Sequence, residues 1–167
     1  LRLKGTLKGK YSPAGLDIDA KLSVVPPWTY TKGDIVVTLK KGNITLDVKQ
    51  SKLKSFTYDV GAEVAVKNIR GGSGDLVIVG TLKGKYTPAG LDIDAELKLK
   101  SAWTYTSGDV KAKFKTGKVT LDVKQSKLKS FTFEVASDVE ISNITGGSGP
   151  LKLKGTLKGK YSPAGLD

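Results

Sequence analysis

Residues 1–24 read LRLKGTLKGKYSPAGLDIDAKLSV, two stretches of alternating apolar and polar residues joined by a turn sequence. Strict alternation with a period of two is typical of a β-strand with one face turned to the core. Residues 12–15, Ser-Pro-Ala-Gly, place proline second and glycine fourth, as a tight turn requires. The segment therefore predicts an antiparallel hairpin with one apolar face and one lysine-rich face.

This opening hairpin recurs along the chain. TLKGKY occurs at residues 6–11, 81–86 and 156–161, so the offset is 75 positions each time. Residues 45–57 return unchanged as 120–132, and Gly-Gly-Ser-Gly occurs at 71–74 and 146–149. Identity this high is typical of a recent duplication, a consensus sequence or a deliberately designed repeat. We predict β repeat unit 1 at 1–75, unit 2 at 76–150, and a partial third unit at 151–167 that supplies a closing or donor strand.

The alternation continues through the rest of each unit, and no segment has a 3.6-residue period. We expect about six strands per unit, with a turn at Lys41-Gly42-Asn43, and an all-β fold of antiparallel amphipathic strands. Glycines at inward positions favour a curved, barrel-like sheet. A β-sandwich and an open β-trough produce the same alternation and stay open as alternatives.

The composition limits the chemistry that the side chains can carry out. The chain has no Cys, His or Met, which removes thiol chemistry, the usual zinc ligands and the commonest general base. We therefore expect no enzyme, no catalytic residue, no cofactor and no metal site. No apolar stretch is long enough for a transmembrane helix, and the sequence does not indicate a cellular location. Asp17 and Asp19, with Asp92 and Asp94, have a spacing that can bind calcium, but we interpret them as solvated charges.

The net charge is +12, from 28 basic and 16 acidic residues, and only Arg2 and Arg70 are arginine. Specific recognition of bases and phosphates favours the arginine fork, whereas lysine along strands solubilises a sheet and protects its edges. We therefore expect no specific nucleic-acid binding. Nonspecific binding to polyanions through the lysine-rich face stays an alternative, and it would vanish at moderate salt.

Two sets of residues are candidates for an interaction. Glycines and aromatic residues share the apolar face, where the glycines either make room for packing or leave space for an apolar ligand. A second set consists of valines that face outward among lysines, and they form a possible interface patch. The first set is Gly5, Gly9, Tyr11, Trp28, Tyr30, Gly80, Gly84, Tyr86, Trp103 and Tyr105, and the second is Val25, Val36, Val77 and Val79.

The stretch 80–86, GTLKGKY, followed by 91–97, LDIDAEL, resembles in style the AsmA-like and TamB-like bridge proteins. The resemblance runs along both units and includes no single diagnostic motif. It implies a long curled sheet of repeated short strands, with an apolar inner trough that carries lipid between membranes.

Three functions fit these observations. We favour a structural repeat scaffold that completes its sheet or self-assembles through the repeated terminal strand, because an unpaired strand can add to the edge of another copy. The first alternative is a carrier of lipid or another hydrophobic ligand on the apolar face. The second alternative is the nonspecific polyanion binding described above.

Overall fold

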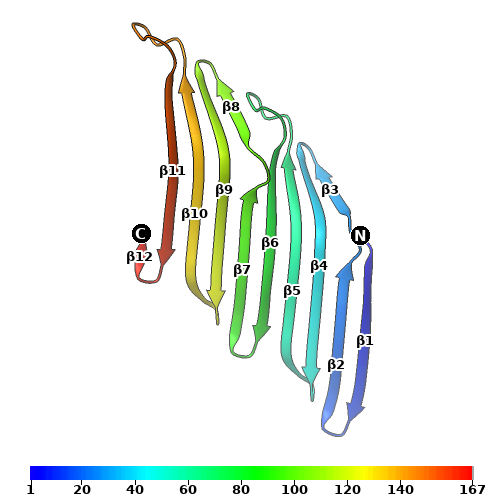
Figure 1. The fold of residues 1–167 in the computed structure, drawn as a ribbon. Coiled ribbons are helices and arrows are strands. Elements are labelled where there is room, and N and C mark those ends of the chain that lie inside the picture. Colours follow the sequence, from blue (N-terminus) through cyan, green and yellow to red (C-terminus); the bar gives the residue numbers. More distant parts are fainter. Residues whose placement is uncertain (167) are drawn as a thin grey trace.

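The structure, a computed structural model, describes residues 1–166 and is one antiparallel sheet with twelve strands (Figure 1). The predicted all-β antiparallel class is confirmed. The strands are β1 (Leu3–Ser12), β2 (Gly15–Val24), β3 (Trp28–Lys32), β4 (Ile35–Lys49), β5 (Lys52–Val66), β6 (Leu76–Thr87), β7 (Gly90–Leu99), β8 (Trp103–Ser107), β9 (Val110–Lys124), β10 (Lys127–Ile141), β11 (Leu151–Ser162) and β12 (Gly165–Leu166).

The strands follow one another across the sheet almost in chain order, β1-β2-β4-β5-β6-β7-β9-β10-β11-β12. The short strands β3 and β8 lie off this path and pair with β4 and β9. The bounds of β7 to β10 lie 75 positions after those of β2 to β5. Because β5 pairs with β6 along eleven residues, the sheet crosses the predicted unit boundary at 75/76 without interruption.

The expected turn at Lys41-Gly42-Asn43 is wrong. Residues 35–49 form one strand, and a bulge between Leu39 and Lys41 shifts its register against β5. The bulge absorbs one extra residue and keeps Leu39 and Gly42 on the same face. Gly42 is buried, and a Cβ there would lie 2.7 Å from the Val24 side chain, so this glycine serves close packing within the sheet.

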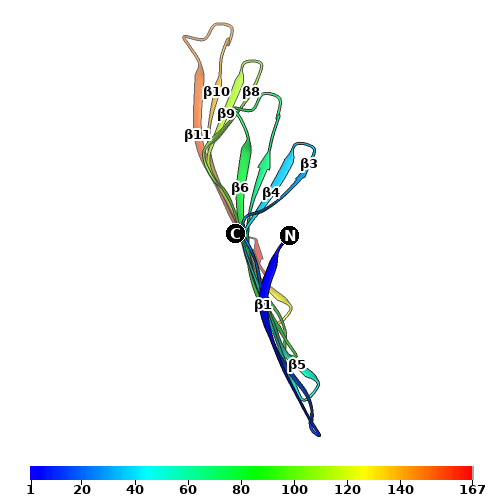
Figure 2. The same cartoon turned by 90° about the vertical axis from the view of Figure 1, so that its right-hand side faces the viewer.

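The sheet is open. Figure 2 shows it edge-on as a single thin layer in its lower half, with the upper ends of the strands fanning apart. The path runs from β1 to β12 without returning, and the two ends of the described chain lie at opposite edges (Figure 1). The barrel closure and the sandwich considered from sequence are therefore not formed by residues 1–166, since alternation alone does not distinguish one layer from two. The strand β11 extends the sheet by pairing with β10, as β6 pairs with β5.

The turn between β4 and β5 is anchored to the neighbouring hairpin. Gln50 and Ser51 both have positive φ, 50° and 59°, as the two central residues of a type I′ hairpin turn require. The Asp17 carboxylate accepts the Gln50 N–H at 2.8 Å, and the Ser51 hydroxyl accepts the Leu16 N–H at 3.0 Å. Asp92 accepts the Gln125 N–H in the same way at 2.8 Å. These carboxylates thus have a structural role in the turns.

Candidate functional site

The most prominent feature of the molecule is an apolar face without a cover. Cross-strand register places one set of alternating residues on this side of the sheet in every strand from β1 to β11. We call this side the apolar face and the other the polar face. Examples of rows that run across the apolar face are Leu7–Ala20–Leu46–Phe56–Tyr86–Leu91 and Leu97–Val119–Phe133–Gly159.

No hydrophobic side chain of the described residues is buried. The accessible surface is 11397 Å², whereas a compact protein of 17.7 kDa exposes about 7900 Å². Leu7 is 75% exposed, Leu157 65% and Leu97 52%, so the exposure runs the whole width of the sheet. Exposed apolar area of this extent marks an interaction surface rather than an ordinary protein exterior.

The glycines predicted on the apolar face lie there, and most are covered by a neighbour. The Tyr58 ring lies over Gly84, its direct cross-strand partner, and the Phe133 ring lies over Gly159 in the same way. A Cβ at Gly80 would come within 2.8 Å of the Leu97 side chain. Large residues that fill glycine positions across strands pin the register and allow close packing. The sequence analysis did not include Tyr58 and Phe133 among the candidate residues of the apolar face. Their alternation with Phe56 and Phe131 indicates that they lie on the same face as these aromatic residues.

The glycine of β1 that corresponds to Gly84 is not covered. A Cβ at Gly9 would meet only the Asp17 carbonyl oxygen, at 3.8 Å. β1 lies at the edge of the described sheet, so among the described residues no strand on its other side supplies a side chain in the position that Tyr58 has over Gly84. Tyr11, next to it on the same face, is 82% exposed.

The predicted aromatic pairs also lie on the apolar face. Trp28 stacks on Tyr30 with ring centroids 6.2 Å apart, and Trp103 stacks on Tyr105 at 6.1 Å. Register pairs Trp28 with Leu39 and Trp103 with Phe114, both on this face. Trp103 also stacks on Phe114, with centroids 6.2 Å apart.

A cavity of about 460 Å³ opens on the apolar face where β7 ends and β8 begins. Its lining is almost wholly hydrophobic and includes Leu76, Ile78, Leu99, Trp103 and Phe114. Register brings together Ile78 and Leu99, and the same cavity reaches Val119 and Val135 on β9 and β10. Among the residues predicted to form an apolar ligand or packing face, Trp103 lines this cavity.

The valine patch is gathered only in part. Val36, Ala65 and Val77 form one row on the polar face, and Val79 lies two residues along from Val77. Val25 lies elsewhere, beyond the end of β2, where its N–H bonds the Arg2 carbonyl at 2.9 Å.

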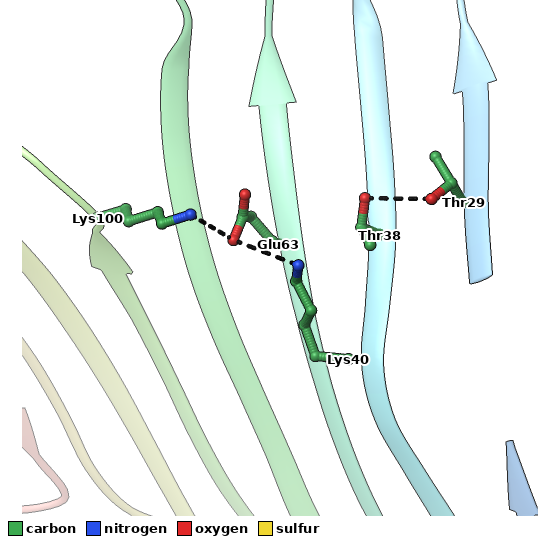
Figure 3. Close-up of polar contacts among 5 residues, drawn as sticks. All are labelled: Thr29, Thr38, Lys40, Glu63 and Lys100. Carbon is green, nitrogen blue, oxygen red and sulfur yellow. Dashed lines mark hydrogen bonds and ion pairs between the residues drawn. The ribbon is translucent and has the colours of Figure 1, made fainter. Parts of the chain in front are cut away.

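An ion pair spans β6 next to this patch. The Lys100 Nζ donates to the Glu63 carboxylate at 2.8 Å, and the Lys40 Nζ lies 4.0 Å from the same carboxylate (Figure 3). The Glu63 hydrogen bond with Lys100 lowers the pKa of this carboxyl below its ordinary value, although burial opposes the shift. The pKa of Glu96 is lowered by Lys118, and that of Asp138 by Lys115, through hydrogen bonds of the same kind.

Part of the lysine on the polar face is paired with carboxylates within the sheet. Carboxylates pair with lysines across strands at 2.6 to 3.0 Å in Lys115–Asp138, Lys118–Glu96 and Lys158–Glu134. In the described part of the chain, no cluster of three or more potential metal ligands occurs, and no helix is suited to crossing a membrane.

Comparisons with protein-family models, with curated proteins and with solved structures return no match for this chain. The functional argument therefore depends on the geometry of the sheet itself.

The glycine positions give a matched pair of substitutions. Gly84→Ala places a methyl group against the Tyr58 ring and the Asp92 carbonyl, so we expect a loss of about 1–3 kcal/mol of unfolding free energy. Gly9→Ala, at the uncovered equivalent, should stay within about 0.5 kcal/mol of the parent. Urea unfolding followed by tryptophan fluorescence measures both. Equal effects of the two changes would show that Tyr58 does not fill the Gly84 position.

The lowered pKa of Glu63 gives a prediction for pH. A carboxyl whose pKa is lower in the folded state stabilises the fold above its unfolded pKa of about 4.3, and this contribution is lost as the pH falls through the folded pKa. Glu63→Gln should therefore lower the thermal midpoint slightly at pH 7 and have no effect at about pH 2. Lys100→Gln, which removes the other partner, should match it at pH 7. A difference that is the same at both pH values would contradict the assignment.

Proposed function

We propose that this chain is a non-enzymatic structural protein, a β scaffold whose apolar face is buried against a second copy of the same sheet. The observation that supports this most directly is the absence of any buried hydrophobic side chain in residues 1–165, beside an apolar face as wide as the sheet. Domains are stable when an amphipathic sheet buries its apolar face against another layer, and the described chain has one layer.

The size of the exposed face favours a second sheet as its cover. The accessible surface exceeds that of a compact protein of equal mass by about 3500 Å². A standard protein interface buries about 800 Å² on each partner. A single acyl chain covers a strip of such a face, whereas a second copy presents an apolar surface of equal extent that can pack about 10 Å away.

The distribution of charge allows a second copy to cover the apolar face. Lysines such as Lys8, Lys83 and Lys158 alternate with apolar residues and lie on the polar face. Here the two faces are opposite, so two copies can join their apolar faces while the charges of both stay in water.

The test of this proposal is the dependence of molar mass on concentration, measured by light scattering. We expect a dimer or larger species that dissociates on dilution. Leu82→Gln, on the apolar face, should weaken the association by at least about tenfold, since it buries an amide against apolar atoms. Lys83→Gln changes the adjacent residue on the polar face and is the matched control, with little expected effect. A parent chain that stays monomeric, folded and free of bound ligand at millimolar concentration would refute the proposal.

A second candidate function rests on the cavity between β7 and β8. Its volume of about 460 Å³ lies within the range of small-molecule sites, and its lining is apolar. We propose as the alternative that this cavity holds an acyl chain or similar hydrophobe, which is also the function that the resemblance to lipid-bridging sheets implies.

This alternative predicts that the protein retains lipid through purification. Solvent extraction and mass spectrometry should then recover acyl chains in near-stoichiometric amount. Gly117→Val should reduce that amount several-fold, because Gly117 lines the cavity and its nearest neighbour, the Leu99 Cβ, is 3.7 Å away from an added Cβ. Lipid-free protein with an intact apolar face would exclude the carrier and leave the scaffold.

A further inference from the structure

Two turns at the same end of the sheet have the same basic sequence. Residues 49–54 and 124–129 both read KQSKLK and form the β4–β5 and β9–β10 turns (Figure 1), and we call them the basic turns. Like charges directly opposite one another in an antiparallel pair destabilise it. Strand register nevertheless places two lysines opposite each other in each turn, Lys49 with Lys52 and Lys124 with Lys127.

The carboxylates near the basic turns pair with only some of these lysines. The Lys49 Nζ lies 3.8 Å from the Asp47 carboxylate, and the corresponding distance from Lys124 to Asp122 is 3.6 Å. Asp17 also reaches a basic turn, but its carboxylate accepts a main-chain N–H there. In the part of the chain that the structure describes, four lysines of the basic turns form no ion pair, namely Lys52, Lys54, Lys127 and Lys129.

The basic turns are held in place by the neighbouring hairpins. The Ser51 N–H donates to the Leu16 carbonyl at 2.8 Å, and the Ser126 N–H donates to the Leu91 carbonyl at 2.8 Å. The hydroxyl groups of the same two serines accept the N–H of Leu16 and of Leu91, both at 3.0 Å. A site that is ordered before binding loses less conformational freedom when a ligand binds. Both turns therefore present their lysines in one arrangement without help from a ligand.

The lysines of the basic turns are accessible from the end of the sheet. β5 pairs with β4 from Lys52 onward, but its pairing with β6 begins only at Phe56. β10 repeats this arrangement, because it pairs with β9 from Lys127 onward and with β11 only from Phe131. The lysine side chains of both turns are exposed. A ligand can therefore approach them along the polar face or past the end of the strands.

The spacing of the basic turns favours a ligand longer than a single small anion. β4 and β9 are four positions apart in the order of the strands, so at about 4.8 Å per strand the turns are at least about 19 Å apart. Both turns place their opposed lysines on the polar face, so one chain of anionic groups can contact both. A ligand that spans two sites binds more tightly than either site alone would bind it.

The residue types favour an anionic polysaccharide over a nucleic acid. The basic turns contain lysine and no arginine, and lysine binds an anion as a point charge, without the planar geometry of the arginine fork. Sites for single-stranded nucleic acid add aromatic side chains on which the bases stack. Here the nearby aromatic residues Phe56 and Phe131 lie on the apolar face, opposite the lysines.

We propose that the two basic turns form a binding site for a linear anionic polysaccharide, which runs along the end of the sheet and contacts both turns. The site goes beyond the proposed scaffold and is compatible with it, because copies that join their apolar faces keep the basic turns in water. Contacts between exposed charges are screened by salt, so binding weakens as the ionic strength rises.

The proposal is tested with fluorescently labelled oligosaccharides derived from heparin, by anisotropy. Lys52→Gln with Lys54→Gln removes two charges from one basic turn. Lys111→Gln with Lys113→Gln is the matched control, since it removes two charges from the polar face of β9 at the other end of the sheet. For an oligosaccharide long enough to span both turns, we expect the dissociation constant to rise at least about tenfold in the turn variant and less than about twofold in the control.

A shorter oligosaccharide separates one bridging site from two independent ones. When the ligand cannot reach both turns, the intact turn at 124–129 still binds it, so the dissociation constant should change by no more than about twofold in the turn variant. The number of short ligands bound to each chain should then fall from two to one. An equal loss of affinity for the short and the long ligand, or an equal loss in the turn variant and the control, would overturn the proposal.

Two further measurements test the chemistry of the ligand and the role of the lysines. Duplex DNA of matched length that binds more tightly than the oligosaccharide would assign the turns to nucleic acid and refute the proposal. The thermal midpoint of the Lys52→Gln, Lys54→Gln variant should be equal to that of the parent or higher, because opposed lysines repel each other. A lower midpoint with unchanged affinity for the long oligosaccharide would show that these lysines serve the fold instead.

Discussion

The rest of the structure depends on a single constraint: one layer of sheet has two faces and cannot bury either by itself. In the described chain the side chains of the apolar face touch only neighbours in the same sheet, and none becomes buried. What holds the strands together is the continuous ladder of main-chain hydrogen bonds, which is longest in the β4–β5 and β9–β10 hairpins. The missing layer is the physical reason to seek a function in association.

Within this limit, the contacts across strands are specific. Tyr58 and Phe133 fill the positions above Gly84 and Gly159, and the main chain of residues 71–73, which follow β5, bonds to that of β8. On the polar face, the carboxylates of Glu63 and Asp138 form ion pairs with Lys100 and Lys115, which lie outside their own strands. Each of these contacts joins segments that lie in different strands or beside them, so they fix the order and register of the sheet.

Local pattern predicted much of the fold, and long-range geometry corrected it. The alternation of Leu3, Leu7 and Tyr11 against Lys4, Lys8 and Lys10 assigns the faces as the register has them. Lys41-Gly42-Asn43 was misread as a turn because a bulge and a turn use the same residue types. For the candidate site, the glycines and aromatic residues were placed on one face, but the cover of Gly84 by Tyr58 and the separation of Val25 from Val77 depend on strand order.

By itself, the sequence determined the strands, their two faces and the recurrence of the same segments, because alternation and turn residues act over a few positions. It also excluded thiol and imidazole chemistry through the absence of cysteine and histidine. Only the tertiary structure decided that the sheet stays open in one layer. A barrel closes only when the twist and the register shifts of all its strands together bring the last strand back to the first, and no local pattern determines that total. The order of the strands also brings residues 71–74 against β8, a contact between segments about 30 positions apart that no local pattern in the sequence indicates.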